Sequence, residues 1–238
     1  MVRTEMRNPS TLCQFRILLT KDLRIEFRTK EMVTSMGLYA LLVLTVYGAS
    51  LAQTAWGFNI LQMSGGLLWV VIIFTSLLGL NRSFSQEKEF AALDGILLVP
   101  MDRSVIFLAK MTANLIFLLV IQIITVPLFI FFFLATTTPA ETALLIVIPL
   151  LVGSIGIAGI GTLLSTITMH TRGKDVLLAV LFIPLIFPLL YACVSATSMM
   201  LVGTDDLGAI WRSLALAGGY DVIMILLGWV LYDFLLSA

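Results

Sequence analysis

Residues 105–134 read VIFLAKMTANLIFLLVIQIITVPLFIFFFL, an apolar run that carries a single charge, at Lys110. This run decides the fold, because a helix needs about 20 apolar residues to cross about 30 Å of hydrocarbon. Five further apolar runs lie at 34–53, 64–80, 143–168, 176–202 and 214–236. Hydrophobic residues make up 60% of the 238 residues and charged residues 12%, which excludes an ordinary soluble protein. The sequence therefore predicts an all-α integral membrane protein with six transmembrane helices.

The basic residues fall in alternate gaps between these runs. Of the 14 lysines and arginines, seven precede the first run, four lie between residues 82 and 110, and two lie between residues 169 and 175. The three remaining gaps hold one basic residue, Arg212. Because cytoplasmic loops are enriched in lysine and arginine, both termini are predicted to be cytoplasmic. We expect a cytoplasmic N-terminus over 1–33 and a single transmembrane domain over 34–238.

The residues before the first run predict an amphipathic helix over 12–30. Apolar residues recur every three or four positions on one face, at Leu12, Phe15, Leu19, Leu23 and Phe27. Lysine and arginine residues occupy the opposite face. A basic amphipathic helix beside a membrane span typically lies in the lipid headgroup layer, so contact with membrane lipid is expected. A grip on a cytoplasmic partner is the alternative, and the two roles are compatible.

The second cytoplasmic segment, residues 81–104, is the most specific stretch of the chain. It reads NRSFSQEKEFAALDGILLVPMDRS. Helix-forming residues predict a short amphipathic helix over 86–99, which Pro100 would end. Its acidic residues are Glu87, Glu89 and Asp94, and its apolar face includes Phe90, Leu93 and Leu97. A long connection with its own helical pattern is typical of a functional loop, and a solvated surface loop is the alternative.

The order of residues in this segment resembles the cytoplasmic loop of ABC-2 type permeases. It is most similar to the cytochrome c maturation permease family, CcmB, the B subunit of the Ccm system. The matching positions are Arg82, Phe84, Glu87, Leu93, Asp94, Pro100, Ala109 and Lys110. Similar residues at 65–80 and 172–190 extend the resemblance over residues 12–200. Asn81 and Ala91 depart from the family pattern, which usually has an acidic residue and a glycine there.

The resemblance implies a permease subunit of an ABC transporter for haem export or delivery in a bacterial inner membrane. It implies that residues 86–99 form a coupling helix that sits in a groove of a separate, CcmA-like ATPase subunit. The contact residues would be Arg82, Phe84, Glu87, Glu89, Phe90, Leu93, Asp94, Leu97 and Pro100. Haem-handling subunits and a haem chaperone (CcmC-, CcmD- and CcmE-like) are the further partners implied, with haem as cargo, and a homodimer is left open.

Small residues and prolines within the runs predict features of helix packing. Gly153, Gly156 and Gly159 stand at every third position of the fourth run. Small residues let membrane helices approach closely, so this ridge predicts tight packing, with a substrate-lining face as the alternative. Pro184 and Pro188 are one turn apart in the fifth run and predict a kink there.

Polar residues within the runs predict contacts between helices. Asn114 and Gln122 share one side of the third run and are expected to hydrogen-bond to neighbouring helices, because polar groups at this depth avoid lipid. Lys110 lies near the cytoplasmic end and is interpreted as an anchor that reaches the interface. Asp221 lies seven residues into the last run. A re-entrant or interfacial segment over 203–220 is an alternative, which would place Asp221 at the membrane surface.

The residues that would carry catalysis or a resident cofactor are missing from the sequence. There is one histidine, His170, and neither a Cys-x-x-Cys-His haem-attachment motif nor a metal-ligand cluster. The chain also lacks the Gly-x-x-x-x-Gly-Lys-Ser/Thr motif that cradles ATP phosphates, so ATP would be bound by a partner. We expect a non-catalytic subunit with no bound cofactor or metal and no nucleic-acid partner. A motor that releases a haem chaperone, and an exporter of lipid or polysaccharide, are the competing interpretations.

Overall fold

The computed structural model describes residues 10–52, 60–89, 103–134, 144–168, 171, 173–204 and 206–235. Its elements are α1 (Thr11–Thr29), α2 (Glu31–Ala52), α3 (Ile60–Glu89), α5 (Arg103–Phe129), the π-helix η1 (Ile130–Leu134), α7 (Val147–Thr168), α8 (Lys174–Val202) and α9 (Leu207–Leu235). Six helical spans in this part of the chain, including α5 continued by η1, are long and apolar enough to cross a membrane. The prediction of an all-α, multi-pass membrane protein is confirmed.

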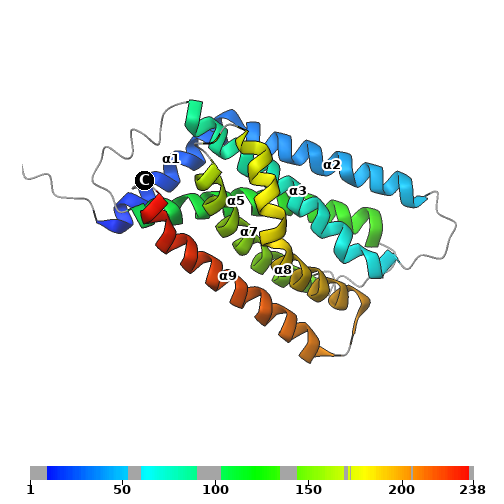
Figure 1. Ribbon diagram of the computed structural model, residues 1–238. Helices are drawn as coiled ribbons and strands as arrows, with labels where there is room; N and C mark the ends of the chain where they lie inside the picture. The colour runs from blue at the N-terminus through cyan, green and yellow to red at the C-terminus, as the bar shows by residue number, and fades with distance from the viewer. Residues whose placement is uncertain are drawn as a thin grey trace, which may run out of the picture.

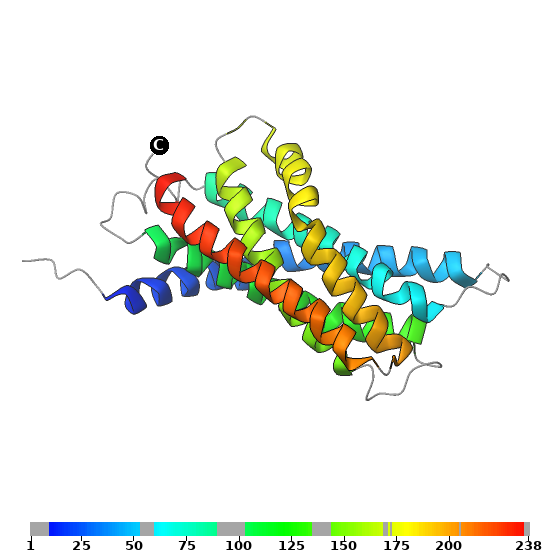
Figure 2. The same cartoon turned by 60° about the horizontal axis from the view of Figure 1, so that its bottom comes forward.

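Helix α7 lies at the centre of the bundle. It packs against α9, α8, α5 and α3, and Figures 1 and 2 show it between these neighbours. Its glycine, serine and threonine side chains are small, so the backbones of the neighbouring helices can approach α7 closely. The outer helices α2 and α9 instead expose large apolar side chains, including Leu38 and Val222. These outward faces suit contact with lipid.

The elements that the charge pattern assigns to the cytoplasm gather at one end of the bundle. Figure 1 shows α1, the C-terminal end of α3, the start of α5 and the C-terminal end of α9 at the same end. The end of α2 and the start of α9 lie at the other end (Figure 1). This arrangement agrees with six crossings and with both termini on the same side of the membrane.

The turn between α1 and α2 is fixed by Lys30 and Glu26. Lys30 adopts the left-handed conformation with φ 55°, and its backbone N–H donates to the carbonyl of Glu26 at 2.7 Å. The buried Glu26 carboxylate accepts a hydrogen bond from the backbone N–H of Val33 at 2.9 Å. A carboxylate at a helix N-terminus satisfies a free amide and complements the helix dipole. Glu26 therefore joins the two helices into an elbow, defined here as residues 22–33.

The last span differs from its predicted bounds. α9 is one continuous helix from Leu207, not from residue 214, so the alternative of a re-entrant segment over 203–220 is wrong. Asp206 explains the early start, because its carboxylate caps the helix by accepting from the backbone N–H of Ala209 at 2.9 Å. The two adjacent glycines, Gly218 and Gly219, do not break the helix. Asp221 consequently lies near the middle of a membrane span.

Candidate functional site at the cytoplasmic end

Helix α1 contacts the bundle through part of the apolar stripe that the sequence predicts and through polar residues beside it. Its buried residues are Gln14, Leu18 and Glu26, whereas Leu12 and Phe27 of the predicted apolar stripe are 81% and 65% exposed. The helix packs mainly along α5, and its buried positions are four and eight residues apart, so they lie on one face of the helix. Two polar groups on this side have partners on α5 and α2: Asp22 faces Lys110, and Glu26 accepts from Val33. Phe15, Leu19 and Leu23 of the predicted stripe pack against the core. The lipid contact expected of this helix stays a prediction, which the exposed Leu12 and Phe27 suit.

Lys110 is buried and paired, so its interpretation as an anchor that reaches the interface is wrong. Its side chain lies on α5, only 5% of the residue is exposed, and its Nζ is 4.0 Å from Asp22 Oδ2 on α1. Lys21 approaches the same carboxylate at 3.1 Å. A carboxylate between two ammonium groups lowers the cost of burying Lys110, because each charge has an opposite neighbour. This contact attaches α1 to the first turns of α5.

A second ion pair joins the cytoplasmic ends of α3 and α2. Arg82 Nη1 donates to Glu31 Oε2 at 2.8 Å, and both side chains are about half exposed. Exposed ion pairs of this kind add about 0–1 kcal/mol of stability. The pair therefore adds little stability and mainly fixes the end of α3 relative to the start of α2. It places the last described side chain of α3 beside the first residue of α2.

The two ion pairs hold both flanks of the cytoplasmic connection against the elbow. On one side Arg82 meets Glu31, and on the other Lys110 meets Asp22. Residues 81–89 continue α3 as one helix, so the predicted separate helix does not begin at residue 86. Phe84, Glu87 and Glu89 thus belong to the last turns of α3. The remaining predicted contact residues, Phe90, Leu93, Asp94, Leu97 and Pro100, lie outside the described residues.

The outward face of α1 is a basic groove. It has a volume of about 720 Å³ and is lined by Arg16, Ile17, Thr20, Lys21, Arg24, Ile25 and Arg28. Apolar and basic side chains alternate along it, which suits a partner that offers negative charge beside hydrocarbon. Among the residues described, no three histidine, cysteine, aspartate or glutamate side chains gather closely enough to hold a metal ion.

The polar residues of α5 make the contacts between helices that the sequence predicts. Asn114 Nδ2 donates to Thr162 Oγ1 at 3.0 Å, and Gln122 Nε2 donates to Ser154 Oγ at 2.8 Å. Both acceptors lie on α7, and all four groups are buried. The expectation for Asn114 and Gln122 is confirmed. These bonds fix α5, and with it one flank of the connection, against the central helix.

The glycine ridge of α7 faces three different helices. A Cβ at Gly153 would overlap the ring of Trp69 on α3, and one at Gly156 would overlap the side chains of Asp221 and Leu189. At Gly159 it would lie 3.2 Å from Ile225. The ridge therefore makes space for neighbouring side chains. Helix α8 runs unbroken through both of its prolines, residues 184 and 188, and the predicted kink stays a prediction.

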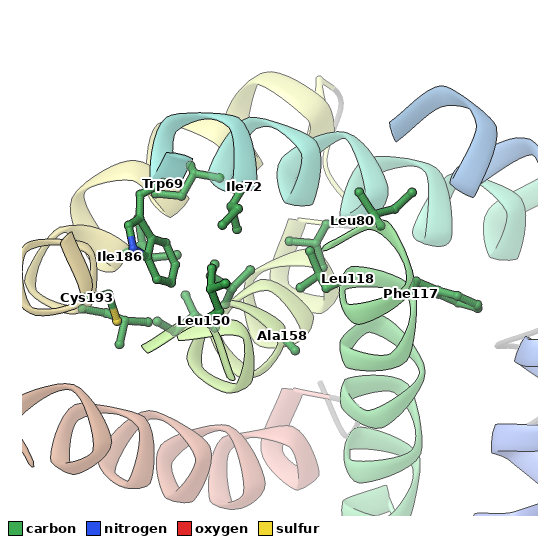
Figure 3. Close-up of a cluster of buried hydrophobic side chains, with 14 of the residues drawn as sticks. Trp69, Ile72, Leu80, Phe117, Leu118, Leu150, Ala158, Ile186 and Cys193 are labelled. Atoms are coloured by element: carbon green, nitrogen blue, oxygen red, sulfur yellow. The ribbon is translucent and has the colours of Figure 1, made fainter. Parts of the chain in front are cut away.

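Trp69 links α3 to α8 by a hydrogen bond that the sequence analysis did not predict. Its Nε1 donates to Thr197 Oγ1 at 2.9 Å, and Thr197 Oγ1 in turn donates to the carbonyl of Cys193 at 2.7 Å. Figure 3 shows Trp69 and Cys193 close together in the buried cluster. The chain offered one signal for this contact, a tryptophan within an apolar run, because a buried indole N–H needs an acceptor.

Comparison with known proteins finds relatives over most of the chain. The family described as "CcmB protein" matches residues 13–230. "Heme exporter protein B" of Pseudomonas aeruginosa is 25% identical over 195 residues, which cover 82% of this chain and 85% of that protein. "Heme exporter protein B" of Rhodobacter capsulatus is 27% identical over 176 residues, which cover 74% of this chain and 78% of that protein.

Proposed function

The chain belongs to the CcmB family, and from this premise we propose that it is the membrane-spanning permease subunit of an ABC transporter for haem export and cytochrome c maturation. The names of its relatives in Pseudomonas and Rhodobacter support the assignment to haem export. The six spans support a subunit that sits within the bilayer. The bacterial inner membrane is the compartment proposed, with haem as the cargo of the system.

The energy for this work comes from a separate ATPase subunit. We propose that this ATPase binds the connection between α3 and α5, through residues from Arg82 to Pro100. The observation that carries this proposal is the attachment of both flanks to the elbow, by Arg82–Glu31 at 2.8 Å and Lys110–Asp22 at 4.0 Å. Force on the connection would thus reach α1, α2, α3 and α5 together. Hydrogen bonds from α5 to Thr162 and Ser154 would pass it to α7.

The packing at α7 favours release of a haem chaperone over passage of haem through this subunit. Trp69 occupies the space left by Gly153, and the Asp221 carboxyl occupies the space left by Gly156. A pathway for haem beside α7 would have to displace both side chains. We therefore place the partners, a haem chaperone and the haem-handling membrane subunits, at the edge of the bundle. ATP hydrolysis would then change the positions of the helices that contact these partners.

The basic groove of α1 is assigned to anionic lipid of the cytoplasmic leaflet. Arginine side chains along Ile17 and Ile25 can bind phosphates while the apolar groups enter the acyl boundary. Lipid contact would hold α1 at a fixed depth. The elbow would then be a fixed reference against which the connection between α3 and α5 moves.

Replacing Leu93 by aspartate is expected to reduce recovery of the ATPase at least tenfold when this subunit is affinity-purified from detergent-solubilised membranes. A charge introduced into an apolar contact must be desolvated without a partner, which destabilises an interface by several kcal/mol. Mass spectrometry of the purified complex measures the ratio of ATPase to this chain. Leu207→Asp is the matched control, since Leu207 is 67% exposed at the opposite end of the bundle. Equal ATPase recovery with both variants would remove the connection as the docking site.

A further inference from the structure

Asp221 is a buried carboxylic acid near the middle of a membrane span. Only 4% of the residue is exposed, and it is the fifteenth of the 29 residues of α9. At 1.5 Å per residue, about 21 Å of helix separates it from either end. Its surroundings therefore contain hydrocarbon and packed protein rather than headgroups. Acidic residues at such depth are rare and commonly take part in ion or proton pathways.

The carboxyl occupies a place that a glycine provides. It lies against Gly156 of α7, and its Cγ is 2.9 Å from the position that a Cβ of residue 156 would take. Leu189 of α8 closes the same space. Among the residues that the structure describes, no group donates a hydrogen bond to Asp221 Oδ1. The site is thus shaped around the carboxyl but leaves this oxygen unsatisfied.

The neighbouring charges do not neutralise a carboxylate at this site. α9 packs against α7, α8 and α5, and α7 carries no titratable side chain. From α8 the thiol of Cys193 interacts electrostatically with Asp221, and the adjacent Tyr220 donates its hydroxyl to the carbonyl of Leu185. Of the described basic side chains Lys110 is the one that is buried, and it faces Asp22 at 4.0 Å.

We propose that Asp221 is an intramembrane proton-binding site, whose carboxyl holds a proton while it is packed against Gly156. An unpaired carboxylate in a medium of low polarity is unfavourable by several kcal/mol or more, and a bound proton removes the charge. The neutral acid is also compatible with the apolar contact with Leu189. Any state of the protein that brings water to this carboxyl would release the proton. The inference does not depend on the proposed transport function.

The test is infrared spectroscopy of the full-length protein in lipid nanodiscs at neutral pH. A protonated carboxyl has a C=O stretch that is well separated from the bands of carboxylates and amides. We expect this band in the wild type, its downshift on labelling with ¹³C-aspartate, and its loss in Asp221→Asn. Asp206→Asn is the matched control and should keep the band, because Asp206 is an exposed carboxylate at the start of the same helix.

Two results would overturn the proposal. One is a wild-type spectrum without the acid band at neutral pH, which would mean that Asp221 is ionised. The other is a band that survives in folded Asp221→Asn, which would place the proton on another residue. If Asp221→Asn does not fold, Asp221→Glu replaces it. The proposal then predicts that the band loses its ¹³C-aspartate shift and gains a ¹³C-glutamate shift.

Discussion

Replacing Gly153 by leucine is expected to prevent stable folding of the protein in the membrane. Gly153 faces Trp69, and a Cβ at this position would overlap the indole ring and lie 3.1 Å from Cys193 Sγ. Trp69 is only 1% exposed and is held by its hydrogen bond to Thr197, so it has no free space into which to move. Overpacking a well-packed core commonly lowers stability by about 1–3 kcal/mol. Because the indole ring of Trp69 is fixed, we expect the loss for Gly153→Leu to reach or exceed the upper value.

The measurement is thermal unfolding in detergent, followed by size-exclusion chromatography with fluorescence detection. We expect Gly153→Leu to give aggregated protein, or a midpoint lower by ten degrees or more, roughly what a loss of 3 kcal/mol produces in a chain of this size. Gly219→Leu is the matched control, because no atom lies within 4 Å of the added Cβ on the exposed side of α9. Two variants with equal midpoints would show that α7 is not the tightly packed centre of the bundle.

Reversing the charge of Lys110 is expected to cause the second large loss of stability. Lys110→Glu places a carboxylate against Asp22 in a site where 5% of the lysine is exposed. Breaking a buried pair costs about 3–5 kcal/mol, because the remaining charge is left without compensation. The elbow would separate from α5, so one flank of the proposed ATPase-binding connection would lose its support. Thermal unfolding and ATPase recovery should therefore fall together.

The double variant Asp22→Lys with Lys110→Glu tests the pair directly. It restores opposite charges across the contact and should recover at least half of the lost stability, as a double-mutant cycle requires of interacting residues. Arg82→Glu is the matched control, since its partner Glu31 is about half exposed and the expected change is about 0–1 kcal/mol. A double variant that is no more stable than Lys110→Glu would contradict a direct interaction with Asp22.

The six spans could be predicted because the bilayer imposes a simple requirement of length and polarity. The interhelical hydrogen bonds of Asn114 and Gln122 were also predicted, because buried amides must find partners within the protein, but Thr162 and Ser154 as acceptors were not. The polar contacts that hold α1 to the bundle were not predicted. The apolar stripe was expected to contact lipid, whereas the polar residues Asp22 and Glu26 hold the helix to α5 and α2. Their four-residue spacing was the available signal.

The start of α9 and the environment of Asp221 required tertiary information. The sequence left open a re-entrant or interfacial segment over 203–220, yet the cap at Asp206 and the packing of α9 on α7 and α8 keep the helix continuous. The contact between Asp221 and Gly156 joins residues 65 positions apart, and no local pattern specifies it. The order of residues in the segment 81–104 identified the family without these contacts.

The most direct test of the account is the haem content of c-type cytochromes in cells that lack this chain. Covalently bound haem is measured by peroxidase staining of denatured membrane proteins, alongside the amount of apocytochrome. The proposed function predicts loss of haem-containing c-type cytochromes with apocytochrome still produced, and recovery when the wild-type chain is supplied. Normal haem staining in the deletion strain would contradict a role in cytochrome c maturation, and would direct the search toward another exported cargo.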